Sequence, residues 1–182
     1  MKALNWFLNL AILGLFIGVA AANENPAATD AKQAPVAEAR ARLGTGGRAV
    51  VNHVNQMGDE VFKLISVEYL VDAQPIFQKA DPGELAALKE IEVFNDNIGP
   101  GTHRLSVQMV YQGRPVWIFS YVEGYKFKVS SSYDFTAEQG KTVNVRVVGF
   151  DKGGWLSKLE DRPAIKYDFA VEDQSSTATP SS

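Results

Sequence analysis

The chain has 182 residues, of which 46% are hydrophobic and 21% are charged, with a formal net charge of −3 and no cysteine. This size and composition fit one globular domain with flanking segments. A mildly acidic chain without a basic run is a poor nucleic-acid binder, because phosphate neutralisation supplies most of that affinity. The lack of cysteine excludes disulfides, thiol catalysis, cysteine-ligated zinc and the acylated cysteine of a lipoprotein.

Residues 1–22 have the pattern of a signal peptide. Lys2 provides a short positive region, residues 8–19 are almost entirely apolar, and residues 20–22 are three alanines suited to cleavage. We therefore predict export to the periplasm or beyond, with no stable membrane span after cleavage. An uncleaved anchor is the alternative, because residues 4–22 are about long enough to cross a bilayer.

Residues 23–57 are predicted to be a linker rich in Ala, Pro and Gly. Up to residue 48 this segment has almost no large apolar side chains apart from Val36 and Leu43, and so buries too little surface to offset the entropy of ordering. A flexible tether is favoured, with a short helix or coiled coil at residues 36–43 as the alternative. Residues 173–182 are predicted to be a disordered tail on the same grounds.

The folded domain is predicted to span residues 58–172, where β-branched and aromatic residues alternate with polar ones between turn signals. Seven or eight short strands at hairpin spacing predict an all-β, antiparallel β-sandwich of the Ig-like or transthyretin-like kind. One short helical turn and a flexible N-terminal arm complete this prediction. The expected strands are 61–71, 75–77, 90–94, 102–111, 116–122, 125–129, 142–150 and 164–171, with a helix at 81–88 and a turn at 95–101.

The residues that most often carry catalysis lack a catalytic arrangement in the sequence. His53 and His103 are the only histidines, and neither has the spacing of a metal-binding motif. The serines at 130–132 are not in a G-x-S-x-G turn, and no pair of carboxylates stands out as that of a glycosidase. We therefore predict no enzymatic activity, no cofactor and no metal.

Two aromatic-containing segments are candidate binding surfaces. Trp117 and Tyr121 share one face of a predicted strand, where they line the core or form an exposed platform for sugar or peptide. Trp155 lies in a Gly-rich, charged loop at residues 151–162, either as a lid on the sandwich or as a partner anchor. Exposed sheet edges are a third way to bind a partner, by strand addition. The candidate partner-binding residues are Trp155, Leu156, Trp117, Tyr121 and Tyr125.

Five segments follow one another from residue 62 onward: FKLISVEYLVDAQPIF, IGPGTHRLSVQMVYQG, YKFKVSS, EQGKT and LEDRP. In this order they resemble a family of exported proteins of deltaproteobacteria and their relatives, commonly labelled dihydrolipoamide acetyltransferase. The resemblance covers residues 58–171 and implies an Ala-rich or coiled-coil stretch before a β-sandwich. The turn of Pro100 to His103 is also similar to one in exported Ig-like and transthyretin-like modules.

The acetyltransferase label does not fit these residues. Enzymes of that name use an H-x-x-x-D-G motif, and neither His53 nor His103 begins one. The resemblance implies instead a non-catalytic envelope protein, some of whose relatives accompany energised envelope machinery of the proton-channel type. We predict a periplasmic accessory or adaptor protein that binds another envelope protein, such as one of an energised inner- or outer-membrane complex. Contact is expected through a sheet edge or residues 151–162. The alternative is a carbohydrate- or peptidoglycan-binding module that uses exposed aromatics.

Overall fold

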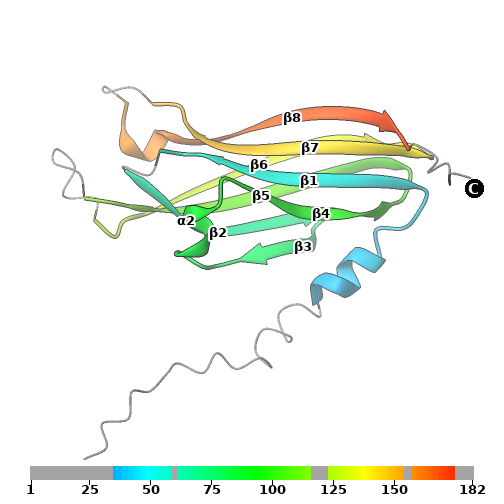
Figure 1. Cartoon of the computed structure of the whole chain (residues 1–182), viewed down its shortest axis with the longest axis horizontal. Helices are drawn as coiled ribbons and strands as arrows, with labels where there is room; N and C mark the ends of the chain where they lie inside the picture. The colour runs from blue at the N-terminus through cyan, green and yellow to red at the C-terminus, as the bar shows by residue number, and fades with distance from the viewer. Residues whose placement is uncertain (1–34, 59–60, 116–122, 154–156, 175–182) are drawn as a thin grey trace, which may run out of the picture.

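A computed structural model describes residues 35–58, 61–115, 123–153 and 157–174. Within these ranges the chain forms eight strands and a few short helical segments (Figure 1). Residues 35–41 are helical and precede the first strand. The elements that follow are β1 (Gly47–Gln56), β2 (Phe62–Val71), β3 (Gln74–Lys79), α2 (Glu84–Ala87), β4 (Glu90–Ile98), β5 (Gly101–Gly113), β6 (Lys126–Ala137), β7 (Lys141–Asp151), the 3-10 turn η2 (Leu159–Asp161) and β8 (Pro163–Asp173).

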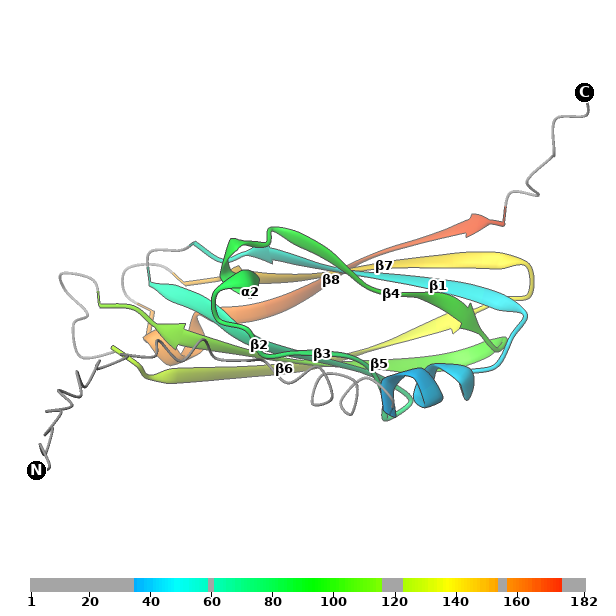
Figure 2. The same ribbon diagram turned by 60° about the horizontal axis from the view of Figure 1, so that its bottom comes forward.

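The strands form two four-stranded sheets, in the orders β4-β1-β7-β8 and β3-β2-β5-β6. The sheets lie face to face as two layers (Figure 2), which confirms the predicted all-β sandwich. One pair departs from the predicted antiparallel pattern, because β1 runs parallel to β7. Only strands joined by a tight hairpin must be antiparallel, and β1 and β7 are far apart in the sequence.

The core lies between the layers and follows the period of two of the strands. On β5, the alternate residues Leu105, Val107, Met109 and Tyr111 are all buried, as their shared face predicts. On β7, the valines at alternate positions are buried in the same way. These are Val143, Val145 and Val147.

The folded unit begins earlier than the predicted boundary at residue 58. β1 falls inside the segment predicted as a linker, yet it occupies a central place in its sheet. Its inward residues Ala49 and Val51 are completely buried, and His53 continues the same face. The linker prediction was wrong here. β1 has no large aliphatic or aromatic side chain and carries polar residues at Asn52 and His53, so its strand pattern is weak.

The short helix at residues 35–41 also belongs to the folded unit, which is the alternative that the sequence left open. The Arg40 guanidinium donates hydrogen bonds to the carbonyl oxygen of Ile76 at 2.9 and 3.2 Å and to that of Val93 at 3.1 Å. These carbonyls belong to β3 and β4, each of which is one of the two edge strands of its sheet. Ala39 and Leu43 are buried beside them. Residues 35–43 therefore bridge one side of the sandwich.

Two smaller predictions also need revision. The turn expected at residues 95–101 begins later, because β4 continues to Ile98 and Asn95 pairs with Val50 of β1. The boundary of the predicted tail at residue 173 is wrong, since Asp173 belongs to β8 and the Gln174 amide still donates to the Gly140 carbonyl, whereas residues 175–182 lie outside the described residues. The strand expected at 116–122 lies outside the described residues.

Candidate functional site

One end of the sandwich gathers the connections that carry the predicted binding residues. Phe62, the first residue of β2, pairs with Gly113 at the end of β5. The Phe62 ring contacts Phe127 of β6 edge-on at 5.1 Å, and the Arg162 guanidinium lies 5.4 Å from its centre. The β5–β6 and β7–β8 connections therefore both start from this end (Figure 1). We call this end the loop end; it presents the exposed Tyr125 and the partly buried Asp151 and Arg162 over the buried Phe62 and Phe127.

Tyr125 is the most exposed large hydrophobic side chain that the structure describes, at 53%. Its ring lies 4.7 Å from that of the buried Phe127, tilted by 59°. The backbone beneath it is fixed, because its carbonyl accepts a hydrogen bond from the Gly113 amide at 2.8 Å. The ring is thus presented to solvent from an ordered base.

The base of the β7–β8 connection is held by an ion pair between Arg162 and Asp151. The Arg162 Nε donates to Asp151 Oδ1 at 3.0 Å, and its Nη2 donates to Oδ2 of the same carboxylate. Partial burial alone would raise the pKa of Asp151, but hydrogen bonds from Arg162 and the Gly153 amide hold it below its ordinary value. Gly153 fits closely here, since a Cβ at this position would overlap the Arg162 side chain.

The described parts of two connections that were predicted separately to carry binding residues both begin at the loop end. Tyr125 is described and exposed there. Two further predicted residues belong to the β5–β6 connection and two to the β7–β8 connection, but their positions lie outside the described residues. These four are Trp117, Tyr121, Trp155 and Leu156. The sequence does not indicate that Phe62 and Arg162 belong to this site, because they meet only through a contact between segments that are far apart in the chain.

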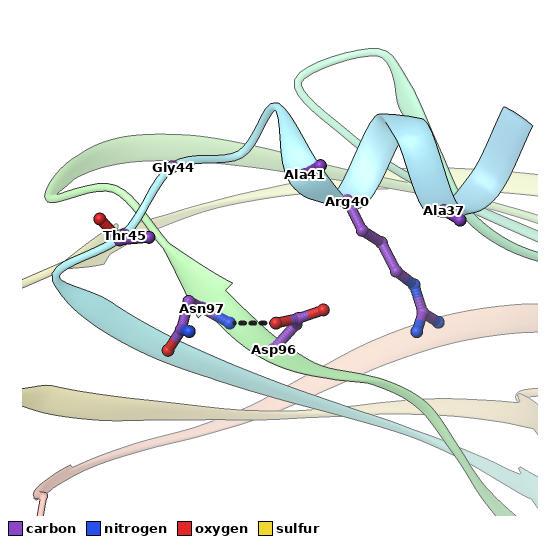
Figure 3. A pocket seen from close by; sticks show the side chains of 7 residues that line it. All are labelled: Ala37, Arg40, Ala41, Gly44, Thr45, Asp96 and Asn97. Atoms are coloured by element: carbon purple, nitrogen blue, oxygen red, sulfur yellow. Dashed lines mark hydrogen bonds between the residues drawn. The ribbon is translucent and has the colours of Figure 1, made fainter.

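A surface pocket of about 410 Å³ lies beside the helix at residues 35–41 (Figure 3). Arg40 lines it, but its guanidinium is committed to backbone carbonyls. Asp96 accepts a hydrogen bond from the Asn97 amide at 2.8 Å. The pocket therefore brings no pair of groups into catalytic contact. Its lining is Ala37, Arg40, Ala41, Gly44, Thr45, Asp96 and Asn97.

His53 lies inside the core, 1% exposed, with its Nδ1 2.6 Å from the hydroxyl of Tyr69. Its Nε2 is buried and has no hydrogen-bond partner among the described residues. Burial lowers the pKa of His53 to about 4. Burial is also the main cause that raises the pKa of Tyr69, with smaller effects of Tyr111 and Tyr167. Because neither ring reaches solvent, this pair has no direct access to a substrate.

His103 links the β2–β3 turn to the β4–β5 turn, at the end of the sandwich opposite the loop end. Its Nδ1 lies 2.6 Å from Asp72 Oδ2, and its Nε2 lies 2.8 Å from the carbonyl oxygen of Gly99. Within the described ranges, no three His, Asp or Glu side chains gather closely enough to hold a metal ion. In the same part of the chain, no helix is long and apolar enough to cross a membrane.

Comparison with protein families, with curated protein sequences and with solved structures finds no match for this chain. Its function is therefore inferred from the loop end itself.

Proposed function

We propose that the protein is an exported, non-catalytic accessory protein that binds another envelope protein through the loop end. The observation that carries this proposal is Tyr125, a half-exposed aromatic ring on an ordered base at the end where both predicted binding connections start. The signal-peptide pattern of residues 1–22 supports a periplasmic location. A component of an energised membrane complex is the class of partner that the sequence resemblance favours.

Physical chemistry favours an aromatic anchor at such a place. Tyrosine buries a large area on binding and has few rotatable bonds, so little side-chain entropy is lost. The tilted contact with Phe127 restricts the ring further, and the hydrogen bond from the Gly113 amide fixes the backbone beneath it. Trp117, Tyr121, Trp155 and Leu156 would add contact area from the two connections that start at this end.

A carbohydrate- or peptidoglycan-binding module is the second candidate. The same exposed ring of Tyr125 supports it, because an aromatic face also stacks on sugar rings. The two candidate functions differ in the ligand of the loop end. An accessory protein would bind a folded protein there, and a glycan-binding module would bind a glycan strand.

Affinity purification from a crosslinked envelope fraction separates these functions. We expect a small set of envelope proteins to be recovered with the tagged wild type and lost with Tyr125→Ala and with Trp155→Ala. Tyr125→Phe keeps the ring and should retain them. Recovery of cell-wall fragments that is lost with Trp117→Ala or Tyr125→Ala would favour the glycan-binding function and contradict the first proposal.

A further inference from the structure

β8 is an edge strand that leaves apolar side chains exposed. It is the last strand of its sheet, and Phe169 and Val171 on its inward face are 44% and 41% exposed. The opposite side of the sandwich is better covered, because Arg40 bridges the edges of β3 and β4. On the β8 side, Tyr133 of β6 packs against the inner face of β8, with its ring 5.0 Å from that of Tyr167 and 6.1 Å from that of Phe169, but Phe169 remains partly exposed. Long apolar edges invite strand addition, so natural proteins usually cover them.

The hydrogen bonds between β7 and β8 show which backbone groups face this open edge. The Gln174 amide donates to the Gly140 carbonyl at 3.0 Å, and the Lys152 amide donates to the Arg162 carbonyl at 2.9 Å. The register between these two bonds has no bulge. Hydrogen-bonded pairs alternate along an antiparallel ladder, so the even-numbered residues of β8 bond to β7. The odd-numbered residues therefore direct their N–H and C=O groups outward. They are Ile165, Tyr167, Phe169, Val171 and Asp173.

We propose that a second copy of this chain covers the edge, with β8 pairing antiparallel to β8 of the copy about a two-fold axis at Phe169. In this register Tyr167 lies opposite Val171, and Phe169 lies opposite its own equivalent. Lys166 lies opposite Glu172, and symmetry forms that pair twice. The exposed apolar side chains of β8 then pack against those of β8 in the copy, and the outward backbone groups of the two strands hydrogen-bond to each other.

Charge and backbone chemistry select this axis over its neighbours. An axis at Asp168 would place two Asp168 carboxylates opposite each other, and an axis at Ala170 would place Asp168 opposite Glu172. Both oppose like charges. An axis at Tyr167 matches charges but places Pro163, which has no N–H, opposite Val171. With the axis at Phe169, the five outward residues of one β8 pair with the five outward residues of the other. Each of them has both an N–H and a C=O for hydrogen bonding across the dimer interface.

The dimer would join two four-stranded sheets into one continuous sheet. The loop end lies where β8 begins, whereas the proposed axis lies in the second half of β8 (Figure 1). The dimer and the proposed partner would therefore use different surfaces. A result that disproves the dimer would not disprove partner binding through the loop end, and the reverse also holds.

Sedimentation of the purified, exported protein over a concentration series tests the dimer. We expect a reversible monomer–dimer equilibrium. Lys166→Glu and Glu172→Lys should each raise the dissociation constant about tenfold, because two like-charge pairs replace two opposite-charge pairs. The double variant should restore the wild-type constant. Lys128→Glu, on the outer face of β6, should change nothing. A monomer at every concentration, or no restoration by the double variant, would overturn the proposal.

Single cysteines test the register without background, because the chain has none. Across a two-fold axis at Phe169, the Cα atoms of Phe169→Cys would be about 5.5 Å apart, within the range of a disulfide. We expect rapid oxidation to a covalent dimer. Asp168→Cys would place its Cα atoms too far apart and should crosslink poorly. The reverse order of the two rates, or a dimer that neither variant crosslinks, would overturn the proposed pairing.

Discussion

The β2–β3 turn places two residues other than glycine in the left-handed region of the backbone. Asp72 has a φ of 50° and Ala73 a φ of 62°. A two-residue hairpin turn with both φ values positive favours glycine at its second position, because alanine pays a steric cost there. Asp72 has a compensating role, since its carboxylate accepts hydrogen bonds from His103 and the Arg104 amide.

Ala73→Gly should therefore stabilise the protein by about 1 kcal/mol, with denaturant unfolding as the measurement. Asp72→Gly is the matched control. It relieves the same strain but removes the contacts to His103 and Arg104, so it should not stabilise. A loss of stability in Ala73→Gly would show that this turn has a different conformation.

The buried ring of His53 predicts how stability depends on pH. Its pKa falls from about 6.5 in the unfolded chain to about 4 in the folded protein. The unfolded state therefore binds the proton first as pH falls. Its contribution is fully present above about pH 6.5 and declines between about pH 6.5 and 4. The total loss is about 3 kcal/mol.

Unfolding curves measured from pH 7 to 4 should show this loss in the wild type. His53→Phe paired with Tyr69→Phe removes the titrating ring and the hydroxyl that contacts it. This double variant should lose the His53 part of the pH slope, whatever its absolute stability. An unchanged slope would mean that other groups cause the pH dependence.

At the scale of elements, the helix at residues 35–41 acts through Arg40. Its guanidinium satisfies carbonyls of Ile76 and Val93 on two edge strands and lies 5.4 Å from the centre of the Phe94 ring. Arg40→Ala should lower the free energy of unfolding by about 2 kcal/mol, because charge-assisted bonds to buried carbonyls are lost.

Arg40→Lys keeps the charge but not the planar fork that reaches both carbonyls, so it should recover only part of the loss. Ala37→Ser, on the exposed face of the same helix, should have almost no effect. If Arg40→Ala left stability unchanged, residues 35–43 would not belong to the cooperative unit.

The sequence predicts some elements better than others for physical reasons. β5 and β7 were predicted because their buried faces consist of large apolar residues at alternate positions, such as Leu105 and Val145. The short helix was predicted, but over residues 81–88, whereas α2 begins only at Glu84 with Gly83 as its N-cap. The Asp81 carboxylate still accepts the Glu84 amide at 2.9 Å in the turn before it. β1 was missed because its pattern is weak: its inward face mixes the small Ala49 and the polar His53 with Val51 and has no large aliphatic or aromatic side chain.

At the scale of the whole molecule, the order of the strands brings together segments whose proximity the sequence does not predict. The β5–β6 and β7–β8 connections lie far apart in the sequence, and their common origin follows only from the order of the strands. Tyr125 was predicted as a candidate because an aromatic residue beside a turn is recognisable locally. Tyr125 is supported by Phe127, which Phe62 and Arg162 support in turn through contacts between distant residues that no local pattern predicts.

The central claim is that the loop end binds an envelope protein, and site-specific photocrosslinking in intact cells tests it most directly. A photoreactive amino acid replaces Tyr125 in one strain and Gln139, exposed in the β6–β7 turn at the opposite end, in another. We predict a discrete crosslinked envelope protein at position 125 and none at position 139. Crosslinks at position 139 alone, or none at either position, would contradict the account.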